Sequence, residues 1–349
     1  MSAQPQVMRP FRDNTRQRRQ DIDSLTWATS STLTRELPRV GYLNRIWVQL
    51  QATVALSSAG ALHTRGAHNI VNRFKVNLNL GSNLLFDCSG PMAAVYSDLQ
   101  QRGANVRLAG VGATTADADI YSAPVAMGNN SAVLTWCIPV ALNNGDEFDI
   151  GLIDLQSSQT RVTLEITTGA PTDYSTNATT VTGTFYVAYE YYEIPYESDV
   201  AQPPFVIVRT LEESVPINAV GDVTYEIPKM GILYQLVNEV ILNSSRSNSI
   251  DSQRLTFNRT DTIYNDRRWF TRARNRFDYA WDPATGIYIH DLWHGSNRVS
   301  TGDLRDAIDT ERVSTIQDIV TVSSGASLGS SGTNNLRVGR RIMQVPVAA

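Results

Sequence analysis

The sequence predicts an all-β protein made of two similar domains that follow each other along the chain. Its 349 residues exceed the roughly 250–300 at which a single hydrophobic core stops growing. Apolar residues recur at every second position over long stretches, which is the period of a strand with one buried face. Short motifs of the first half also return in the second half in the same order. Length, period and repetition together predict two β domains.

The motif that indicates the repetition is ELPRVGYL, residues 36–43, which returns as EIPKMGIL, residues 226–233. Four of its eight positions are identical, and the two copies lie 190 residues apart. Proline lacks a backbone N–H and is tolerated where a strand begins or where its edge is unpaired. The glycine that follows permits a bulge or a close backbone approach. We therefore expect the strands that contain Pro38 and Pro228 to be equivalent.

Further pairs of motifs follow in the same order. They are RFKVN (73–77) with RLTFN (254–258), ITTGA (166–170) with TVSSGA (321–326), and EIP (193–195) with QVP (344–346). The offset between the copies falls from 190 through 181 to 151 residues, so the second copy has shorter loops. Residues 103–131 have no compact counterpart later in the chain. They predict a long surface loop in the first domain.

Strands and helices follow from the same periodicity. The even positions between Ile46 and Leu56 are apolar, which predicts one long half-buried strand. Helical period is convincing in only two segments, residues 89–103 and 264–280. Strand period returns at two further sets of positions, Val162, Leu164 and Ile166, and Phe185, Val187, Tyr189 and Tyr191. Each half therefore has one main helix among many strands.

The arrangement of these elements favours a particular β architecture. Each half has about eight β runs, with a helix after roughly the fourth and irregular loop lengths. Two four-stranded sheets packed face to face and joined by long connections account for this pattern. The predicted fold class is therefore all-β, with two tandem eight-stranded jelly-roll barrels, one inserted helix in each, and a basic N-terminal arm. An immunoglobulin-like pair of domains is the alternative.

Charge, hydrophobicity and cysteine content indicate the general properties of the chain. The net charge is −4, but five arginines against Asp13 make the first twenty residues +4 and leave −8 for the rest. No apolar run approaches the ~18 residues needed to cross a bilayer, so we expect a soluble protein. Cys88 and Cys137 are too few for a disulfide framework and predict free buried thiols.

The expected limits are a basic arm (1–24), a first jelly roll (25–195), a linker (196–204) and a second jelly roll (205–349).

A basic arm, a jelly roll ending near Pro195, a linker, and a second jelly roll starting near Phe205 resemble the double jelly-roll major capsid proteins of tectivirus-like and adenovirus-like viruses. The resemblance covers nearly the whole chain and depends on architecture, length and duplication. It implies homotrimers of pseudo-hexagonal outline that tile an icosahedral shell, usually over an internal lipid membrane. It further implies a virion protein, of a bacteriophage or a related virus, that is assembled in the host cytoplasm. The implied partners are neighbouring trimers and other capsid proteins such as a vertex protein.

The sequence contains no motif typical of an enzyme: HExxH, GxSxG, a Gly-rich phosphate loop and CxxC are all missing. His290, Asp291 and His294 of HDLWH could gather around a metal ion, but in a β run they need not converge. We therefore expect neither catalysis, nor a metal, nor a cofactor. One rival class is a carbohydrate-binding spike or lectin-like β-sandwich, whose exposed aromatic residues stack on sugars. Another is a single jelly-roll shell protein with a protruding domain.

Two basic segments are candidate contact sites. The arm contributes Arg9, Phe11, Arg12, Arg16, Arg18 and Arg19. It could contact a membrane or the capsid floor, tie neighbouring subunits together, or bind the genome. Its modest charge and interleaved apolar residues favour the first of these. We expect the arm to contribute little to either barrel core.

The second basic segment is the predicted helix of the second half. It places Arg268, Arg272 and Arg276 along one ridge and aromatic residues such as Trp269 on the next. Arginine with aromatics can bind nucleic acid, but direct nucleic-acid contact is not expected here. The favoured interpretation is that the aromatics pack on the barrel while the arginines pair with nearby acids or with a neighbouring subunit.

Overall fold

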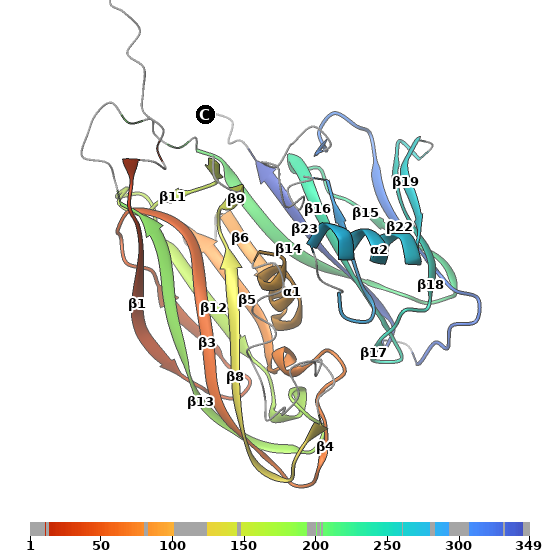
Figure 1. Cartoon of the computed structure of the whole chain (residues 1–349), viewed down its shortest axis with the longest axis horizontal. Coiled ribbons are helices and arrows are strands. Elements are labelled where there is room, and N and C mark those ends of the chain that lie inside the picture. The colour runs from red at the N-terminus through yellow and green to blue at the C-terminus, as the bar shows by residue number, and fades with distance from the viewer. Residues whose placement is uncertain are drawn as a thin grey trace, which may run out of the picture.

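The computed structural model describes residues 11, 14–79, 83–100, 124–144, 148–193, 200, 203, 205–259, 261–279, 283–292, 307–330 and 332–344. They form two β-barrels side by side with a helix between them (Figure 1). The two cysteines, Cys88 and Cys137, are free and buried as predicted. Among the described helices, none is long and apolar enough to cross a membrane.

The first barrel consists of two sheets. One runs in the order β1 (Gln17–Thr26), β13 (Ala178–Tyr192), β3 (Tyr42–Leu56) and β8 (Gly128–Pro139). The other runs in the order β2 (Thr32–Glu36), β12 (Val162–Thr168), β5 (Val71–Leu78) and β6 (Asn83–Cys88). Short strands lie in the connections: β4 (Gly60–Ala61), β7 (Pro124–Val125), β9 (Leu142–Asn144), β10 (Phe148–Ile150) and β11 (Ile153–Asp154). Two 3₁₀ turns span Ala67–Ile70 and Pro171–Asp173.

The second barrel repeats this order strand for strand. Its sheets are β14 (Ile207–Pro216), β23 (Asn335–Gln344), β16 (Ile232–Leu242) and β20 (Ile287–Asp291), and β15 (Gly221–Glu226), β22 (Ile316–Val322), β18 (Ile250–Phe257) and β19 (Asp261–Arg267). Its short strands are β17 (Ser245–Arg246) and β21 (Ile308–Asp309). Helix α1 (Gly90–Gln100) follows β6, and α2 (Arg268–Tyr279) follows β19. Each helix thus comes after the fifth main strand of its barrel, one later than predicted.

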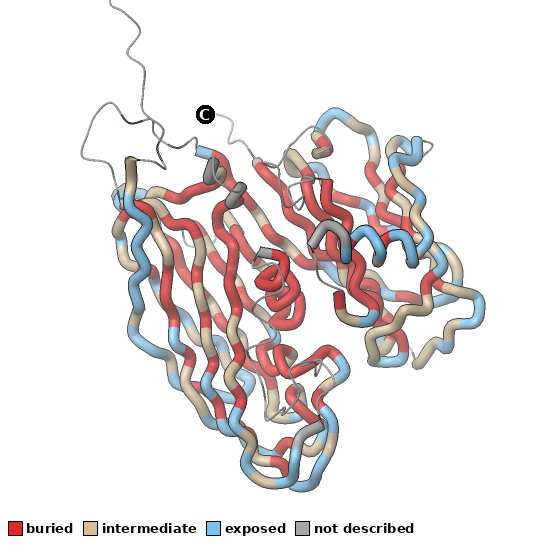
Figure 2. The backbone as a smooth tube through the Cα atoms, viewed as in Figure 1, coloured by how far each residue is buried: buried red, intermediate tan, exposed pale blue. Residues whose placement is uncertain are grey.

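The barrels are held together by alternating apolar side chains, as the periodicity predicts. Every even position of β3 from Ile46 to Leu56 is buried, and β12 buries Val162, Leu164 and Ile166. Figure 2 shows this alternation of buried and less buried residues along the strands of the first barrel. One large core cluster lies mainly in the first barrel and another in the second, so each half has its own interior.

The duplicated motif lies at the same place in both barrels. Gly41 and Gly231 have positive φ angles of 67° and 112° and directly precede β3 and β16. A Cβ atom at Gly41 would lie 2.3 Å from the carbonyl oxygen of Tyr192, and one at Gly231 would lie 2.5 Å from that of Met343. Both carbonyls lie at the end of the last strand of their barrel, within its final two residues. Glycine recurs because the left-handed backbone and the crossing strand leave no room for a side chain.

The predicted pairing of the two prolines needs a correction. Pro38 and Pro228 lie in turns after β2 and β15, not within the strands. The turns are equivalent, because the residue before each proline donates its backbone N–H to the other side of its sheet: Leu37 to Val162 O and Ile227 to Ile316 O, both at 2.9 Å. A turn accepts proline for the same reason as an unpaired edge, since no ladder hydrogen bond is lost.

Two predicted motif alignments are out of register. The backbone N–H of Asn79 donates to Arg161 O, directly before β12, and that of Asn258 donates to Thr315 O, directly before β22. The equivalent of Asn258 is therefore Asn79, so the alignment with Asn77 was two residues wrong. The first residues of β12 and β22 are 154 positions apart, whereas the glycines of ITTGA and TVSSGA are 156 apart. The last pair, EIP with QVP, keeps its predicted offset, because Tyr192 and Met343 directly precede the two motifs.

The expected limit of the N-terminal arm also needs a correction. Residues 17–24, assigned to the arm, belong to β1, which pairs antiparallel with β13 from Gln17 opposite Tyr192 to Thr26 opposite Thr184. The side chains of β1 are mostly exposed, so the strand has no apolar alternation that could reveal it. Its backbone hydrogen bonds to β13 hold it in the sheet.

Other predicted boundaries changed less. The loop expected over 103–131 ends earlier, since residues 128–131 already belong to β8 and residues 101–123 lie outside the described part. The second helix begins at Arg268, because residues 264–267 complete β19. Of the linker expected over 196–204, the structure describes Val200, which is buried, and residue 203.

Replacement of Gly41 by alanine is expected to lower the free energy of unfolding by about 2 kcal/mol, since the left-handed backbone disfavours a Cβ atom and Tyr192 O leaves no space for it. Gly332 is the matched control. It also has a positive φ, 87°, but a Cβ atom there would meet nothing within 4 Å. Gly332→Ala should therefore cost only about 1 kcal/mol. Equal losses in denaturant unfolding would contradict the proposed close approach.

Candidate functional site

A parallel strand pair joins the two barrels. Thr210 of β14 lies opposite Phe86 of β6, and Leu211 lies opposite Asp87. This pairing connects a sheet of each barrel into one ten-stranded sheet, in which eight strands follow the order β17-β16-β23-β14-β6-β5-β12-β2 and β20 and β21 both pair with β16. In Figure 1, β14 runs beside β6 where the two barrels meet. The backbone hydrogen bonds of the sheet thus cross the boundary between the duplicated halves.

Helix α1 fills the space beside this strand pair. Met92 and Tyr96 are buried, and a Cβ atom at Gly339 of β23 would lie 2.6 Å from Tyr96 Oη and 3.0 Å from Met92 Sδ. The guanidinium of Arg341 lies 5.8 Å from the ring centre of Tyr96 and 5.3 Å from that of Tyr234. A helix of the first barrel therefore packs closely on a strand of the second.

A buried cluster of charges completes the junction. Arg65 of the first barrel donates to both carboxylate oxygens of Glu239 on β16, with its shortest contact at 2.6 Å. Arg246 donates to the same carboxylate at 2.7 Å. Burial alone would raise the pKa of Glu239, but the charges of Arg65 and Arg246 outweigh it and hold this pKa well below its usual range.

A second carboxylate extends the cluster. Glu212 of β14 accepts from Arg337 at 2.9 Å and from the backbone N–H of Ser89, which precedes α1, while Arg65 donates to the hydroxyl of Ser89 at 3.0 Å. Removing one partner of such a buried set leaves an uncompensated charge. The junction is therefore specific for one relative placement of the two barrels.

The described part of the predicted N-terminal contact residues lies along the first barrel. Phe11 packs edge-on against Tyr42 and Tyr192, with ring centres 5.4 and 5.7 Å apart. Arg18 pairs with Glu193 at 2.7 Å, and Arg19 lies 5.5 Å from the ring centre of Trp47. Arg16 is exposed just before β1, whereas Arg9 and Arg12 lie outside the described residues. The structure thus places Phe11, Arg18 and Arg19 against the barrel.

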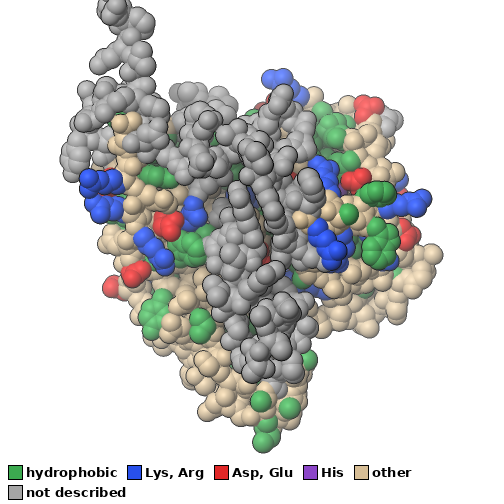
Figure 3. All heavy atoms as spheres, in the orientation of Figure 1, with side chains coloured by type: hydrophobic (Ala, Val, Ile, Leu, Met, Phe, Trp, Pro, Cys, Tyr) green, Lys and Arg blue, Asp and Glu red, His purple; other side chains and the backbone are tan. Residues whose placement is uncertain are grey.

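Helix α2 differs from its predicted packing. Trp269, expected against the barrel, is 66% exposed, and the helix instead buries Thr271 and Asn275. Arg268 donates to Asn248 O, and Arg272 donates to Asn248 Oδ1 at 3.1 Å, so both arginines hold the helix to the backbone and side chain of Asn248. Arg276 is exposed. Figure 3 shows hydrophobic and basic side chains together on the surface in the region of α2.

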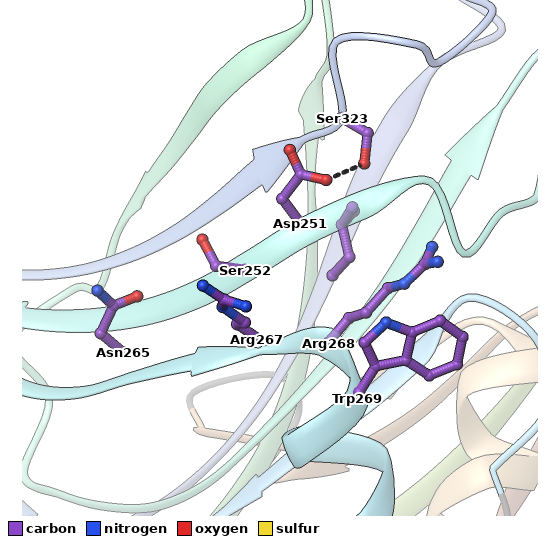
Figure 4. Close-up of a pocket in the computed structure, with 8 residues that line it drawn as sticks. Asp251, Ser252, Asn265, Arg267, Arg268, Trp269 and Ser323 are labelled. Atoms are coloured by element: carbon purple, nitrogen blue, oxygen red, sulfur yellow. Dashed lines mark hydrogen bonds between the residues drawn. The ribbon is translucent and has the colours of Figure 1, made fainter.

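A polar hollow of about 580 Å³ adjoins the start of α2. Figure 4 shows Trp269 and Arg268 at one end of it and Asn265 at the other, with Asp251 bonded to Ser323 above. The histidine of HDLWH that the structure describes lies elsewhere. His290 is buried in β20 with its ring stacked on Tyr264, 4.3 Å between centres.

The residues of HDLWH do not converge in the part that the structure describes. His290 and Asp291 are successive residues of β20, so their side chains point to opposite faces, and His294 lies outside the described residues. Within the described ranges, no group of three or more His, Cys, Asp or Glu is placed to hold a metal ion.

Comparisons by sequence find nothing: no family model and no curated protein matches the chain. Solved structures match over most of its length. The major capsid protein of Sulfolobus turreted icosahedral virus has a TM-score of 0.69 at 17% identity, over 95% of this chain and 97% of that one. PBCV-1 VP54 has a TM-score of 0.62 at 12% identity, over 94% of each chain. The major capsid protein of bacteriophage PM2 has a TM-score of 0.52 at 8% identity, over 95% of this chain and 98% of that one.

The chain has the double jelly-roll fold. This confirms the predicted fold class, two tandem barrels rich in strand with one helix each. Each barrel has the strand order of a jelly roll, β1-β13-β3-β8 against β2-β12-β5-β6 in the first, so the alternative of an immunoglobulin-like pair is wrong.

Sequence reasoning missed the residues that join the two barrels of the double jelly roll. Arg65 and Glu239 are 174 positions apart and carry no local signature. The signal that could have indicated them is the duplication itself, because a chain with two similar domains needs a specific contact between them.

Proposed function

We propose that this chain is a viral major capsid protein that assembles as pseudo-hexagonal homotrimers into an icosahedral shell. The observation that supports it most is the buried junction, which holds two equivalent barrels in one placement within a fold that major capsid proteins share. Two similar barrels in each of three chains give six similar sides. Such a tile needs barrels that cannot rotate against each other.

The remaining expectations belong to the same proposal. The barrels extend over residues 17–195 and 205–349, with the linker 196–204 between them and the arm before Gln17. The partners are neighbouring trimers, a vertex protein and an internal lipid membrane, and the protein resides in the virion after assembly in the host cytoplasm. Arg9 and Arg12 contact the membrane or the capsid floor, while Phe11 anchors the arm to the barrel. The role is structural, without catalysis or direct nucleic-acid binding.

We expect the purified protein to be a trimer, with a mass three times the chain mass of 38.6 kDa. Light scattering measures this mass, and electron microscopy of concentrated protein should show hexagonal tiles or closed shells. A monomer at micromolar concentration that binds immobilised glycans would contradict the proposal. It would favour a lectin-like protein that uses the exposed Trp269 and the hollow beside it.

A further inference from the structure

We propose that the contact between neighbouring chains repeats the junction within one chain, an inference that rests on the proposed capsid function. The edge formed by β19 and α2 binds β1 and the adjoining sheet surface in a second copy, as β6 and α1 bind β14 and β23. The partner of this surface is thus another copy of the same chain. Three observations support the assignment: equivalent elements, available strand edges, and complementary side chains.

The elements are equivalent in detail. Ser97 of α1 accepts a hydrogen bond from the backbone N–H of Cys137 on β8, at 2.9 Å. Asn275 of α2 accepts one from Ile289 on β20, at 3.1 Å. Cys137 lies opposite Trp47 and Ile289 opposite Val237, positions that are related by the 190-residue offset of the duplicated motif. Residues of α1 therefore correspond to residues of α2 that are 178 positions later.

The edges are available within the described part of the chain. β14 pairs with both β23 and β6, whereas its equivalent β1 pairs only with β13. β6 pairs with both β5 and β14, whereas its equivalent β19 pairs only with β18. An open strand edge is a template for pairing with another chain. The described chain thus has an open β1 edge on the first barrel and an open β19 edge on the second. These two edges are the equivalents of the two strands, β14 and β6, that form the junction.

The register of the expected pairing follows from the strand partners. Leu211 lies opposite Arg340 of β23, and the equivalent of Arg340 on β13 is Tyr189, which lies opposite Gln20. Asp87 lies opposite Lys75 of β5, and the equivalent of Lys75 on β18 is Arg254, which lies opposite Asn265 of β19. Asp87 therefore corresponds to Asn265. Because Leu211 pairs with Asp87, we expect Gln20 to pair with Asn265 of the neighbouring copy.

Polar contacts of the junction become charge pairs between chains. Arg209 donates to Asn83 at 2.9 Å, and the equivalents of these residues are Arg18 and Asp261. The guanidinium of Arg341 lies over Tyr96, and the equivalents of that pair have opposite charges. Opposite charges at matching places favour one register over others. The equivalents of Arg341 and Tyr96 are Glu190 and Arg274.

The contact also explains the exposed aromatic face of α2. Met92 of α1 is buried against Gly339 of β23. Its equivalent is Phe270, which is 69% exposed, and the equivalent of Gly339 is Ala188 of β13, which is 5% exposed in the single chain. The side chain of Phe270 thus packs over the position of Ala188 in the next copy, against exposed side chains beside it such as Tyr186, which is 48% exposed. A large apolar side chain at a buried interface of this kind contributes strongly to binding.

A disulfide tests the strand pairing. In the variant Gln20→Cys/Asn265→Cys, the two positions face each other across the expected pair, at a separation that suits a disulfide. The two native thiols are buried, so mild oxidation of the folded protein should act on the introduced ones. We expect covalently linked dimers and trimers on a denaturing gel without reductant. The matched control is Gln20→Cys/Asp222→Cys, because Asp222 lies on β15 at the opposite edge of the same sheet.

The outcomes separate this inference from the proposed function. Trimers that give no cross-link, or that cross-link equally well in the control, would overturn the inference and leave the capsid function standing. A monomer would overturn both. As a second measurement, Phe270→Glu should weaken trimer formation at least tenfold without changing the far-ultraviolet circular dichroism, since Phe270 is exposed in the single chain. Unchanged trimer affinity in that variant would also overturn the inference.

Discussion

Replacement of Glu239 by leucine is expected to lower the free energy of unfolding by about 3–5 kcal/mol. The change removes the carboxylate that Arg65 and Arg246 share and leaves two guanidinium groups buried without it. The loss should be visible as a shift of the midpoint in denaturant unfolding at pH 7. Because Glu239 belongs to the second barrel and Arg65 to the first, the variant should also weaken the contact between barrels.

The matched control is Glu36→Gln on the surface of the first barrel. Glu36 pairs with Arg161 at 2.7 Å, but more than 40% of each side chain is exposed to solvent. Exposed pairs contribute little, so this variant should lose less than about 1 kcal/mol. Similar losses in the two variants would show that the buried cluster does not stabilise the junction.

The second large effect is a loss of stability in acid that originates at His290. Burial and the nearby charge of Arg274 lower the pKa of His290 to about 3 in the folded state. In the unfolded chain it titrates near its ordinary value of about 6.5. The unfolded state therefore binds more protons between these values, and stability falls as the pH falls from about 6.5 to 3. At pH 4 the loss amounts to about 3 kcal/mol as an upper limit.

The measurement compares unfolding of the native chain and of His290→Phe at pH 7 and pH 4. Phenylalanine keeps a ring stacked on Tyr264 but cannot be protonated. The variant should lose less stability in acid than the native chain does. Asp318, whose pKa burial raises to about 6, gains stability in acid, and the buried His68 loses it. Both groups are present in both proteins and cancel in the difference. An identical loss of stability in the two proteins would refute the role of His290.

The duplicated fold could be predicted because some positions are constrained by the backbone. Gly41 and Gly231 recur since a strand passes within van der Waals distance of each, and that constraint is visible as identical letters. The alignment of the RFKVN motif with the RLTFN motif is wrong by two residues. Letters of similar type matched by chance, whereas the true equivalence follows the strand partners and the positive φ angles of Asn79 and Asn258. A pattern of types cannot distinguish these registers.

The candidate site could be predicted only in part. The strand β1 carries Arg18, Arg19 and other exposed side chains, so the charges were noticed but not the backbone pairing with β13. The basic helix was found, but its orientation was reversed. Asn275 satisfies the backbone of Ile289 and therefore faces inward, which turns Trp269 to the solvent. An inward polar residue of this kind has no apolar signature in the sequence.

The ten-stranded sheet also affects how a curved shell could be built from this molecule. Bending the chain between its barrels would break the ladder at Thr210 and Phe86 and separate Arg65 from Glu239. Deforming the contacts between neighbouring molecules therefore costs less free energy than bending one molecule between its two barrels. Under the proposed capsid function, shells of different radius would be assembled from identical stiff plates, and the angle between neighbouring plates would be set by the contacts along their rims.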